Sequence, residues 1–120
     1  MKRSVMAIAA MMSGVVFAMP VHAQDAEAGK KVFKKCAACH KVGEGAKNSV
    51  GPALNGVFGR VAGTVEGYKY GKSIVEAGEA GLVWDDEQID LSIADPKAYM
   101  QEYLKADKVK VKMTYKLKKE

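Results

Sequence analysis

The sequence predicts an all-α, loop-rich domain, and three observations lead to this fold class. Apolar residues recur at helical spacing in four short segments. No segment alternates apolar and polar residues as a half-buried strand does. Residues 41–71 are rich in glycine and have no sustained period, so they predict a long irregular loop. A loop of that length is unusual in a small domain unless something large organises it.

The N-terminus has the features of a secretory signal peptide. Lys2 and Arg3 precede an apolar run over residues 5–17, Pro20 ends the run, and residues 21–23 include the small residues found at cleavage sites. A membrane anchor is the weaker alternative, because the run is shorter than the roughly 20 residues that cross a bilayer. We therefore expect export to the periplasm, cleavage after Ala23, and one domain over residues 24–120.

Cleavage changes the composition that matters. The whole chain has a formal net charge of +5, of which Lys2 and Arg3 leave with the signal peptide. The mature chain is then only mildly basic, which gives nucleic-acid binding little support. It keeps one histidine, His40, and two methionines, Met100 and Met113.

The first helix is expected over residues 25–36. Gly29, Val32, Phe33 and Cys36 recur at helical spacing, and lysines lie on the other side. After the long loop, a short helix is expected over residues 72–77, ended by Gly78.

Two further helices follow close together. Asp85 and Gln88 resemble a capping box that opens a helix with Ile89 and Ile93 on one face. The pair Asp95-Pro96 is an N-cap followed by proline at the first helical position, and it predicts a helix through Leu104.

Residues 35–41 read KCAACHK and hold the only two cysteines, Cys36 and Cys39, directly followed by His40. A disulfide would leave His40 unexplained and would close too short a loop to stabilise much. A thioredoxin-like thiol pair needs a βαβ framework, and structural zinc normally needs four ligands. Covalent haem explains all three residues, because the thiols add to the vinyl groups and the imidazole ligates the iron.

One other short pattern resembles a functional motif. Gly71-Lys72-Ser73 ends like a phosphate-binding loop, but the first glycine of that motif is replaced by Glu66. We interpret it as a helix start after a glycine turn.

The order of motifs resembles class I cytochrome c, of the bacterial periplasmic kind close to mitochondrial cytochrome c. The resemblance covers most of the mature chain. It rests on residues 28–33 and CAACH, on Gly51-Pro52-Ala-Leu54 and residues 56–60, on Tyr70 and Trp84, and on residues 95–99 and 112–115. It implies one covalently bound haem c on Cys36 and Cys39, with short helices and long loops wrapped around it.

The second axial ligand is expected to be Met113. Met100 lies at helical spacing with Tyr103 and Leu104, which favours a core position, whereas Met113 lies outside any periodic segment. The resemblance also places the haem methionine at Met113. Ligation by His40 and Met113 fills both axial sites, so no substrate can reach the iron. This arrangement suits electron transfer rather than catalysis.

The resemblance assigns further roles around the haem. The carbonyl of Pro52 is expected to accept from the Nδ1–H of His40. A haem propionate is expected to be hydrogen-bonded or neutralised by Arg60, Tyr70 and Trp84. Leu54 is expected on the haem face and Tyr115 beside the exposed haem edge.

The expected function is that of a soluble, monomeric periplasmic electron carrier, and not of an enzyme. The family's partners are a membrane quinol–cytochrome c oxidoreductase and a photosynthetic reaction centre or terminal oxidase. Docking to acidic partners is expected of the lysines near the ligands in sequence. These are Lys34, Lys35, Lys41, Lys110, Lys112 and Lys116.

Two alternatives and one departure stay open at this point. An open iron would indicate a haem peroxidase or small-ligand sensor, and absence of haem would indicate a thiol or metal module. Family members continue beyond the methionine into a C-terminal helix that crosses the first helix, whereas this sequence stops at Glu120. We therefore expect the chain to be a fragment that lacks this helix.

Overall fold

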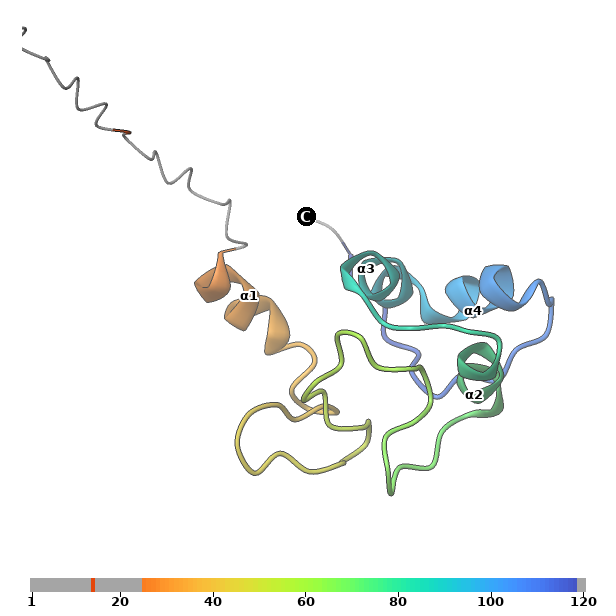
Figure 1. Ribbon diagram of the computed structural model, residues 1–120, viewed down its shortest axis with the longest axis horizontal. Coiled ribbons are helices and arrows are strands. Elements are labelled where there is room, and N and C mark those ends of the chain that lie inside the picture. Colours follow the sequence, from red (N-terminus) through yellow and green to blue (C-terminus); the bar gives the residue numbers. More distant parts are fainter. Residues whose placement is uncertain (1–13, 15–24, 119–120) are drawn as a thin grey trace, which may run out of the picture.

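The computed structural model describes Gly14 and residues 25–118. The predicted signal peptide and its cleavage site after Ala23 lie outside the described residues, apart from Gly14. The described part contains four helices and an isolated antiparallel bridge between Val61 and Val83, which confirms the all-α prediction (Figure 1). None of these helices is long and apolar enough to cross a membrane.

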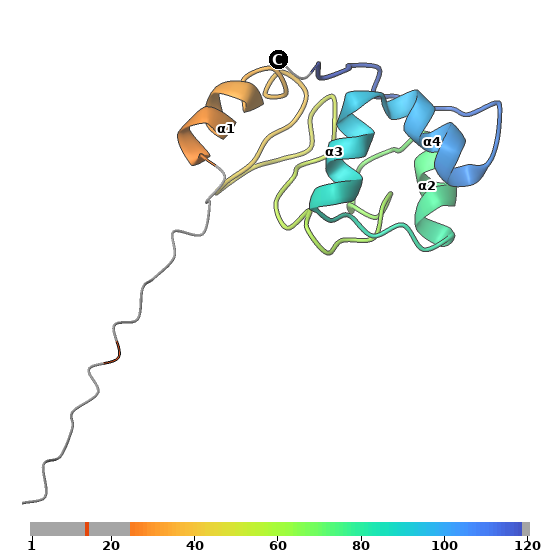
Figure 2. The same ribbon diagram turned by 90° about the horizontal axis from the view of Figure 1, so that it is seen from above.

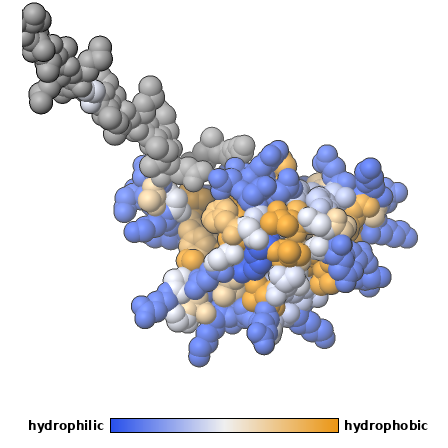
Figure 3. All heavy atoms as spheres, viewed as in Figure 1, coloured by the Kyte–Doolittle hydropathy of each residue, from blue (hydrophilic) through white to orange (hydrophobic). Residues whose placement is uncertain are grey.

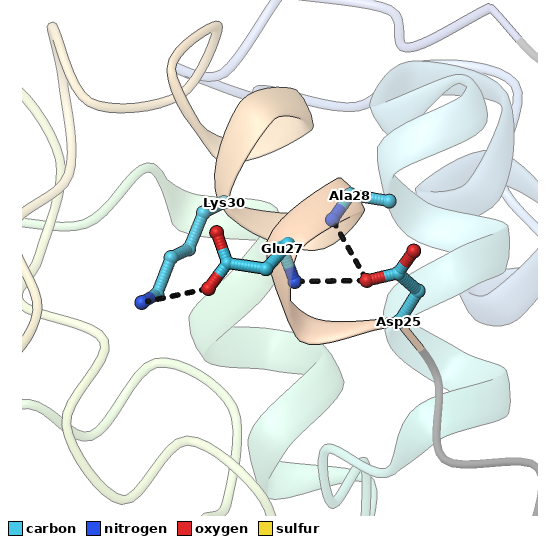
Figure 4. Close-up of polar contacts among 4 residues, drawn as sticks. All are labelled: Asp25, Glu27, Ala28 and Lys30. Atoms are coloured by element: carbon cyan, nitrogen blue, oxygen red, sulfur yellow. Dashed lines mark hydrogen bonds and ion pairs between the residues drawn. The ribbon is translucent and has the colours of Figure 1, made fainter.

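The first helix, α1, spans Ala26–Phe33. Asp25 caps it, because its carboxylate accepts from the backbone N–H groups of Glu27 at 3.0 Å and Ala28 at 3.2 Å (Figure 4). A salt bridge of 3.6 Å joins Lys30 to Glu27 on the exposed face. The helix ends at Phe33 rather than at Cys36, the predicted end, because the chain passes at Lys34 into a series of turns.

The second helix, α2, spans Lys72–Glu79 and passes through Gly78, where the sequence predicted a stop. The reason is packing. A Cβ built at Gly78 would lie 2.0 Å from the carbonyl oxygen of Ala62. Gly78 is therefore the point at which the long loop touches the helix, and not a helix terminator.

Helices α3, Asp86–Ala94, and α4, Pro96–Leu104, begin where their caps predicted. Asp85 accepts from the N–H of Gln88 at 2.8 Å, and Asp95 accepts from that of Ala98 at 3.0 Å. The expected capping box is incomplete, because the amide oxygen of Gln88 instead accepts from the Tyr99 hydroxyl at 2.5 Å.

The core lies where α4 packs against α2 and α3. Its buried apolar residues are Ala62, Ala77, Leu82, Trp84, Tyr99 and Met100. Two views place α1 apart from this group, with segments of the long loop between (Figures 1 and 2). No residue of α1 is buried.

Backbone contacts organise the predicted loop over residues 41–71 in place of regular structure. Its first half is joined to the segment after α1, because Gly51 donates to the Cys39 carbonyl at 2.8 Å. Its second half is joined to the segment after α2, because Ala62 donates to Leu82 at 2.9 Å. The loop thus links α1 to the core and encloses a space between them.

Candidate haem-binding site

An apolar cavity of about 280 Å³ lies between the four described helices, the long loop and the segment that follows α4. The residues on its wall come from all of these parts of the chain. Among the residues that the sequence singled out, the wall includes Cys36, His40, Pro52, Leu54, Arg60, Tyr70, Trp84 and Met113. Residues far apart in sequence are therefore assembled around one space.

His40 is held by its neighbours in a defined tautomer. Its Nδ1 lies 2.8 Å from the carbonyl oxygen of Pro52. Because a carbonyl only accepts, Nδ1 carries the proton, and Nε2 keeps its lone pair for a metal. This contact is the one that the resemblance to class I cytochrome c implied.

The absence of a side chain at Gly51 leaves the space that the His40 ring occupies. A Cβ at Gly51 would lie 2.4 Å from Cε1 and 2.9 Å from Nε2 of the ring. Any other residue at this position would collide with the imidazole. The pair Gly51-Pro52 therefore holds His40 from two sides, by close approach and by a hydrogen bond.

The two cysteines are free thiols in a turn that leads to His40. The N–H groups of Cys39 and His40 both donate to the Cys36 carbonyl, at 3.0 and 2.9 Å. Cys36 is half-buried on the cavity wall, whereas Cys39 is exposed and does not line the cavity. Burial is the larger cause that raises the pKa of the Cys36 thiol, and the nearby Cys39 raises it further.

Cys36 and Cys39 are not bonded to each other. Within residues 25–118, no three or more His, Cys, Asp or Glu side chains are grouped so that they could hold a metal ion.

Met113 is half-buried on the cavity wall, in the segment that follows α4. Several bonds fix this segment. Ser73 exchanges two hydrogen bonds with the backbone of Lys110, and the N–H of Leu117 donates to the Ile93 carbonyl at 2.8 Å. Met100 also borders the cavity, but it is only 3% exposed and belongs to the core cluster, as its helical spacing predicted.

The predicted propionate-binding residues lie together on the wall. Arg60 donates from Nη1 to the carbonyls of Asn55 at 3.1 Å and Ala53 at 3.4 Å. The Tyr70 hydroxyl accepts from the N–H of Val65 at 2.9 Å, and burial raises its pKa. Trp84 is buried and stacks on Tyr99 with ring centroids 6.2 Å apart.

Tyr115 is 44% exposed and is not part of the cavity wall. The six predicted docking lysines are all exposed, but several have partners within the chain. Lys41 donates to the Ala37 carbonyl at 2.6 Å, Lys116 pairs with Asp95 at 3.2 Å, and Lys112 donates to the Lys69 carbonyl. Figure 3 shows apolar side chains gathered in the middle of one face, with hydrophilic side chains projecting around it.

Sequence reasoning missed the residues that hold the long loop in shape. Asn55 exchanges two hydrogen bonds with the backbone of Gly43, and Asn48 bridges Glu66 and Ala53. The Tyr68 hydroxyl donates to the Val50 carbonyl at 2.8 Å. Asparagine among glycines signals turn formation, but the sequence does not show which distant backbone each side chain meets.

The turn over residues 36–40 and the cavity wall together hold the donors that a covalently attached haem requires. Two free thiols and an imidazole with Nε2 available lie in one turn, a thioether lies on a separate part of the wall, and the remaining wall is mainly apolar. Gly51 leaves room for the imidazole, where any Cβ would displace it. An all-α chain with this site belongs to the class of small haem-binding electron-transfer proteins.

The comparisons agree with this class. The family model "Cytochrome c" matches residues 26–90. Cytochrome c2 of Afifella marina is 53% identical over 73 residues, which are 61% of this chain and 59% of that protein. Cytochrome c-551 of Roseobacter denitrificans is 45% identical, over 84% of this chain and 77% of that protein.

A solved structure gives the same answer for the fold. The structure of cytochrome c2 from Rhodobacter capsulatus is similar with a TM-score of 0.74 at 40% identity, over 80% of this chain and 88% of that one. The chain belongs to the cytochrome c family. It has the class I fold, takes one covalently attached haem c, and is an electron-transfer protein rather than an enzyme.

Proposed function

We propose that this chain is a periplasmic electron carrier in which His40 and Met113 are the axial ligands of one haem c. Cys36 and Cys39 are the two attachment points. The observation that supports the proposal is the meeting of Cys36, His40 and Met113 on the wall of one apolar cavity. Met113 is distant in sequence from the other two, so only the fold brings them together.

Each side chain has a distinct task in this proposal. When bound, haem c supplies an iron that takes up and releases one electron. The Pro52 carbonyl keeps the proton of His40 on Nδ1, so that Nε2 is the ligand atom. The Met113 thioether favours the ferrous state and raises the reduction potential relative to harder ligands. With both axial sites filled, the site has no position for a substrate.

Arg60, Tyr70 and Trp84 are proposed to receive the haem propionates. The Tyr70 oxygen already accepts from Val65, which leaves its own O–H as the free donor. A tyrosine keeps that proton at neutral pH in any case, and burial raises the pKa of Tyr70 further. Arg60 would supply a positive charge to neutralise a propionate carboxylate. Leu54 is proposed to pack on the haem face and Tyr115 to lie beside its exposed edge.

The proposed partners are membrane complexes that hand on electrons. The donor is a quinol–cytochrome c oxidoreductase, and the acceptor is a photosynthetic reaction centre or terminal oxidase. Of the six docking lysines, Lys34 and Lys35 are exposed beside the end of α1, while Lys110 and Lys112 border the cavity. Exposed positive charges of this kind steer weak electron-transfer complexes towards acidic partners.

The axial ligands are tested on the holoprotein, expressed with a haem attachment system. We expect an intact mass that includes one haem, which acid acetone does not extract, and loss of one thioether link in Cys36→Ala or Cys39→Ala. Met113→Ala should lower the reduction potential, remove the far-red methionine–iron band and speed CO binding.

Met100→Ala is the matched control, because Met100 is also a methionine on the cavity wall. It should lower the melting temperature and leave the far-red band in place, since Met100 belongs to the core cluster. The opposite pattern would assign the ligand role to Met100. Fast CO binding by the unmodified ferrous protein would contradict the electron-carrier proposal and favour an open iron site.

A further inference from the structure

We propose that the first turn of α2 with its N-cap, Gly71–Ser73, is a positioning element for Met113, and that Ser73 sets how firmly the methionine is held at its place on the cavity wall. This inference rests on the proposed role of Met113 as axial ligand. It gives a function to the Gly71-Lys72-Ser73 pattern, which does not form a phosphate-binding loop.

Ser73 is a buried polar residue that bonds the segment before Met113. It is 4% exposed and lies in the first turn of α2. Its Oγ accepts from the N–H of Lys110 at 2.7 Å, and its own N–H donates to the Lys110 carbonyl at 3.3 Å. Ser73 therefore bonds both backbone polar groups of Lys110, the N–H through its hydroxyl and the carbonyl through its own N–H.

Gly71 allows this close approach. Its backbone has an ordinary φ of −65°, so glycine is not needed for conformation. A Cβ at this position would lie 3.0 Å from the Lys110 carbonyl oxygen and 3.6 Å from the Lys112 nitrogen. The absence of a side chain lets the loop lie directly on the start of α2.

The Lys112 side chain adds a second attachment. Its ammonium group donates to the Lys69 carbonyl and lies 5.4 Å from the centroid of the Tyr68 ring. The backbone is thus fixed at Lys110 and the side chain at Lys112, immediately before Met113. Three residues span at most about 11 Å, so an anchor at Lys110 restricts where the thioether can lie.

The test is Ser73→Ala in the holoprotein. Without the hydroxyl, the Lys110 N–H loses its acceptor, and the loop should open more often by about tenfold, the effect of one buried hydrogen bond. We expect cyanide to bind the ferric protein about tenfold faster, since one hydrogen bond holds the loop closed, with a weaker far-red band. Ser73→Thr keeps the hydroxyl and should restore both.

Two other variants separate positioning from general stability. Gly71→Ala pushes on Lys110 without removing a hydrogen bond, and should also speed cyanide binding. Gly78→Ala is the control, because its Cβ would collide with Ala62, in the long loop, rather than with the Met113 segment. It should lower the melting temperature without changing the cyanide rate or the far-red band.

The outcomes distinguish this inference from the function on which it rests. If Met113→Ala leaves the far-red band intact, Met113 is not the ligand and both proposals fail. If Met113→Ala removes the band while Ser73→Ala and Gly71→Ala behave like Gly78→Ala, only the positioning role of the turn is wrong.

Discussion

Replacing Gly51 by alanine should displace the His40 ring. Gly51 is buried and does not adopt a left-handed φ, so its backbone tolerates an alanine. The added Cβ would nevertheless lie 2.4 Å from Cε1 and 2.7 Å from Nδ1 of His40. The change therefore acts through this one contact, on a ring whose other neighbour is the Pro52 carbonyl.

Three terms, one stabilising and two destabilising, set the size of the effect on the free energy of unfolding. Alanine reduces the freedom of the unfolded chain, which stabilises by about 0.4–1 kcal/mol. Forcing an extra carbon into a packed site costs about 1–3 kcal/mol. Moving the ring away also strains the 2.8 Å bond to Pro52, which contributes about 0.5–1.5 kcal/mol. We expect a net loss of roughly 2 kcal/mol from a total stability of about 5–15 kcal/mol.

Thermal unfolding and the spectrum of the holoprotein measure this effect. A loss of about 2 kcal/mol corresponds to a fall in melting temperature of roughly 8–16 °C for a domain of this size. The low-spin spectrum expected from the proposed ligation by His40 should change as well. Gly78→Ala should also lower the melting temperature, but with an unchanged spectrum. If Gly51→Ala melts and absorbs like the unmodified protein, the ring is not confined as described.

The remaining predictions concern pH and salt. Burial raises the pKa of Tyr99 to about 12, so the folded state favours the neutral form of its side chain. The resulting contribution to the free energy of unfolding is fully present below the usual tyrosine pKa of about 10. It is lost as the pH rises towards 12. Tyr99→Phe should therefore flatten the alkaline end of the stability profile, measured by denaturant unfolding at a series of pH values; an unchanged slope would assign it to another group. Electron-transfer rates with an acidic membrane partner should fall steeply with ionic strength, because surface charges are screened over about 10 Å at 0.1 M salt; rates that do not depend on salt would contradict the docking role of the lysines. Lys34→Gln should reduce the low-salt rate more than Lys116→Gln, because Lys116 is already paired with Asp95.

The helix starts were predictable because their signals are local. Asp25, Asp85 and Asp95 cap within three residues of themselves, and the sequence contains both partners of each contact. Helix ends were less predictable, because they depend on what the helix meets. Gly78 would end an isolated helix, yet here it allows the contact with Ala62 that holds α2 against the long loop.

The candidate site also has one part that was predictable from local sequence and one part that depends on distant contacts. Cys36, Cys39 and His40 form one turn, and their spacing alone indicates the chemistry of attachment. Tyr68, Asn48 and Asn55 were missed, because each bonds a backbone group more than ten residues away. A pattern in the sequence shows that such residues favour turns, but not which turn each one closes.

The two proposed axial ligands are therefore held by different kinds of structure. His40 depends on a short stretch that reaches only to Gly51 and Pro52, and its tautomer follows from a single hydrogen bond. Met113 depends on contacts that are 37 residues apart in the case of Ser73 and Lys110, and 43 in the case of Lys69 and Lys112. Contacts between distant segments are lost when the start of α2 separates from the segment before Met113, whereas a local turn can persist. The reduction potential of this protein should consequently respond to changes at Ser73 and Gly71 by way of Met113, while the proposed attachment of the haem stays a property of residues 36–40.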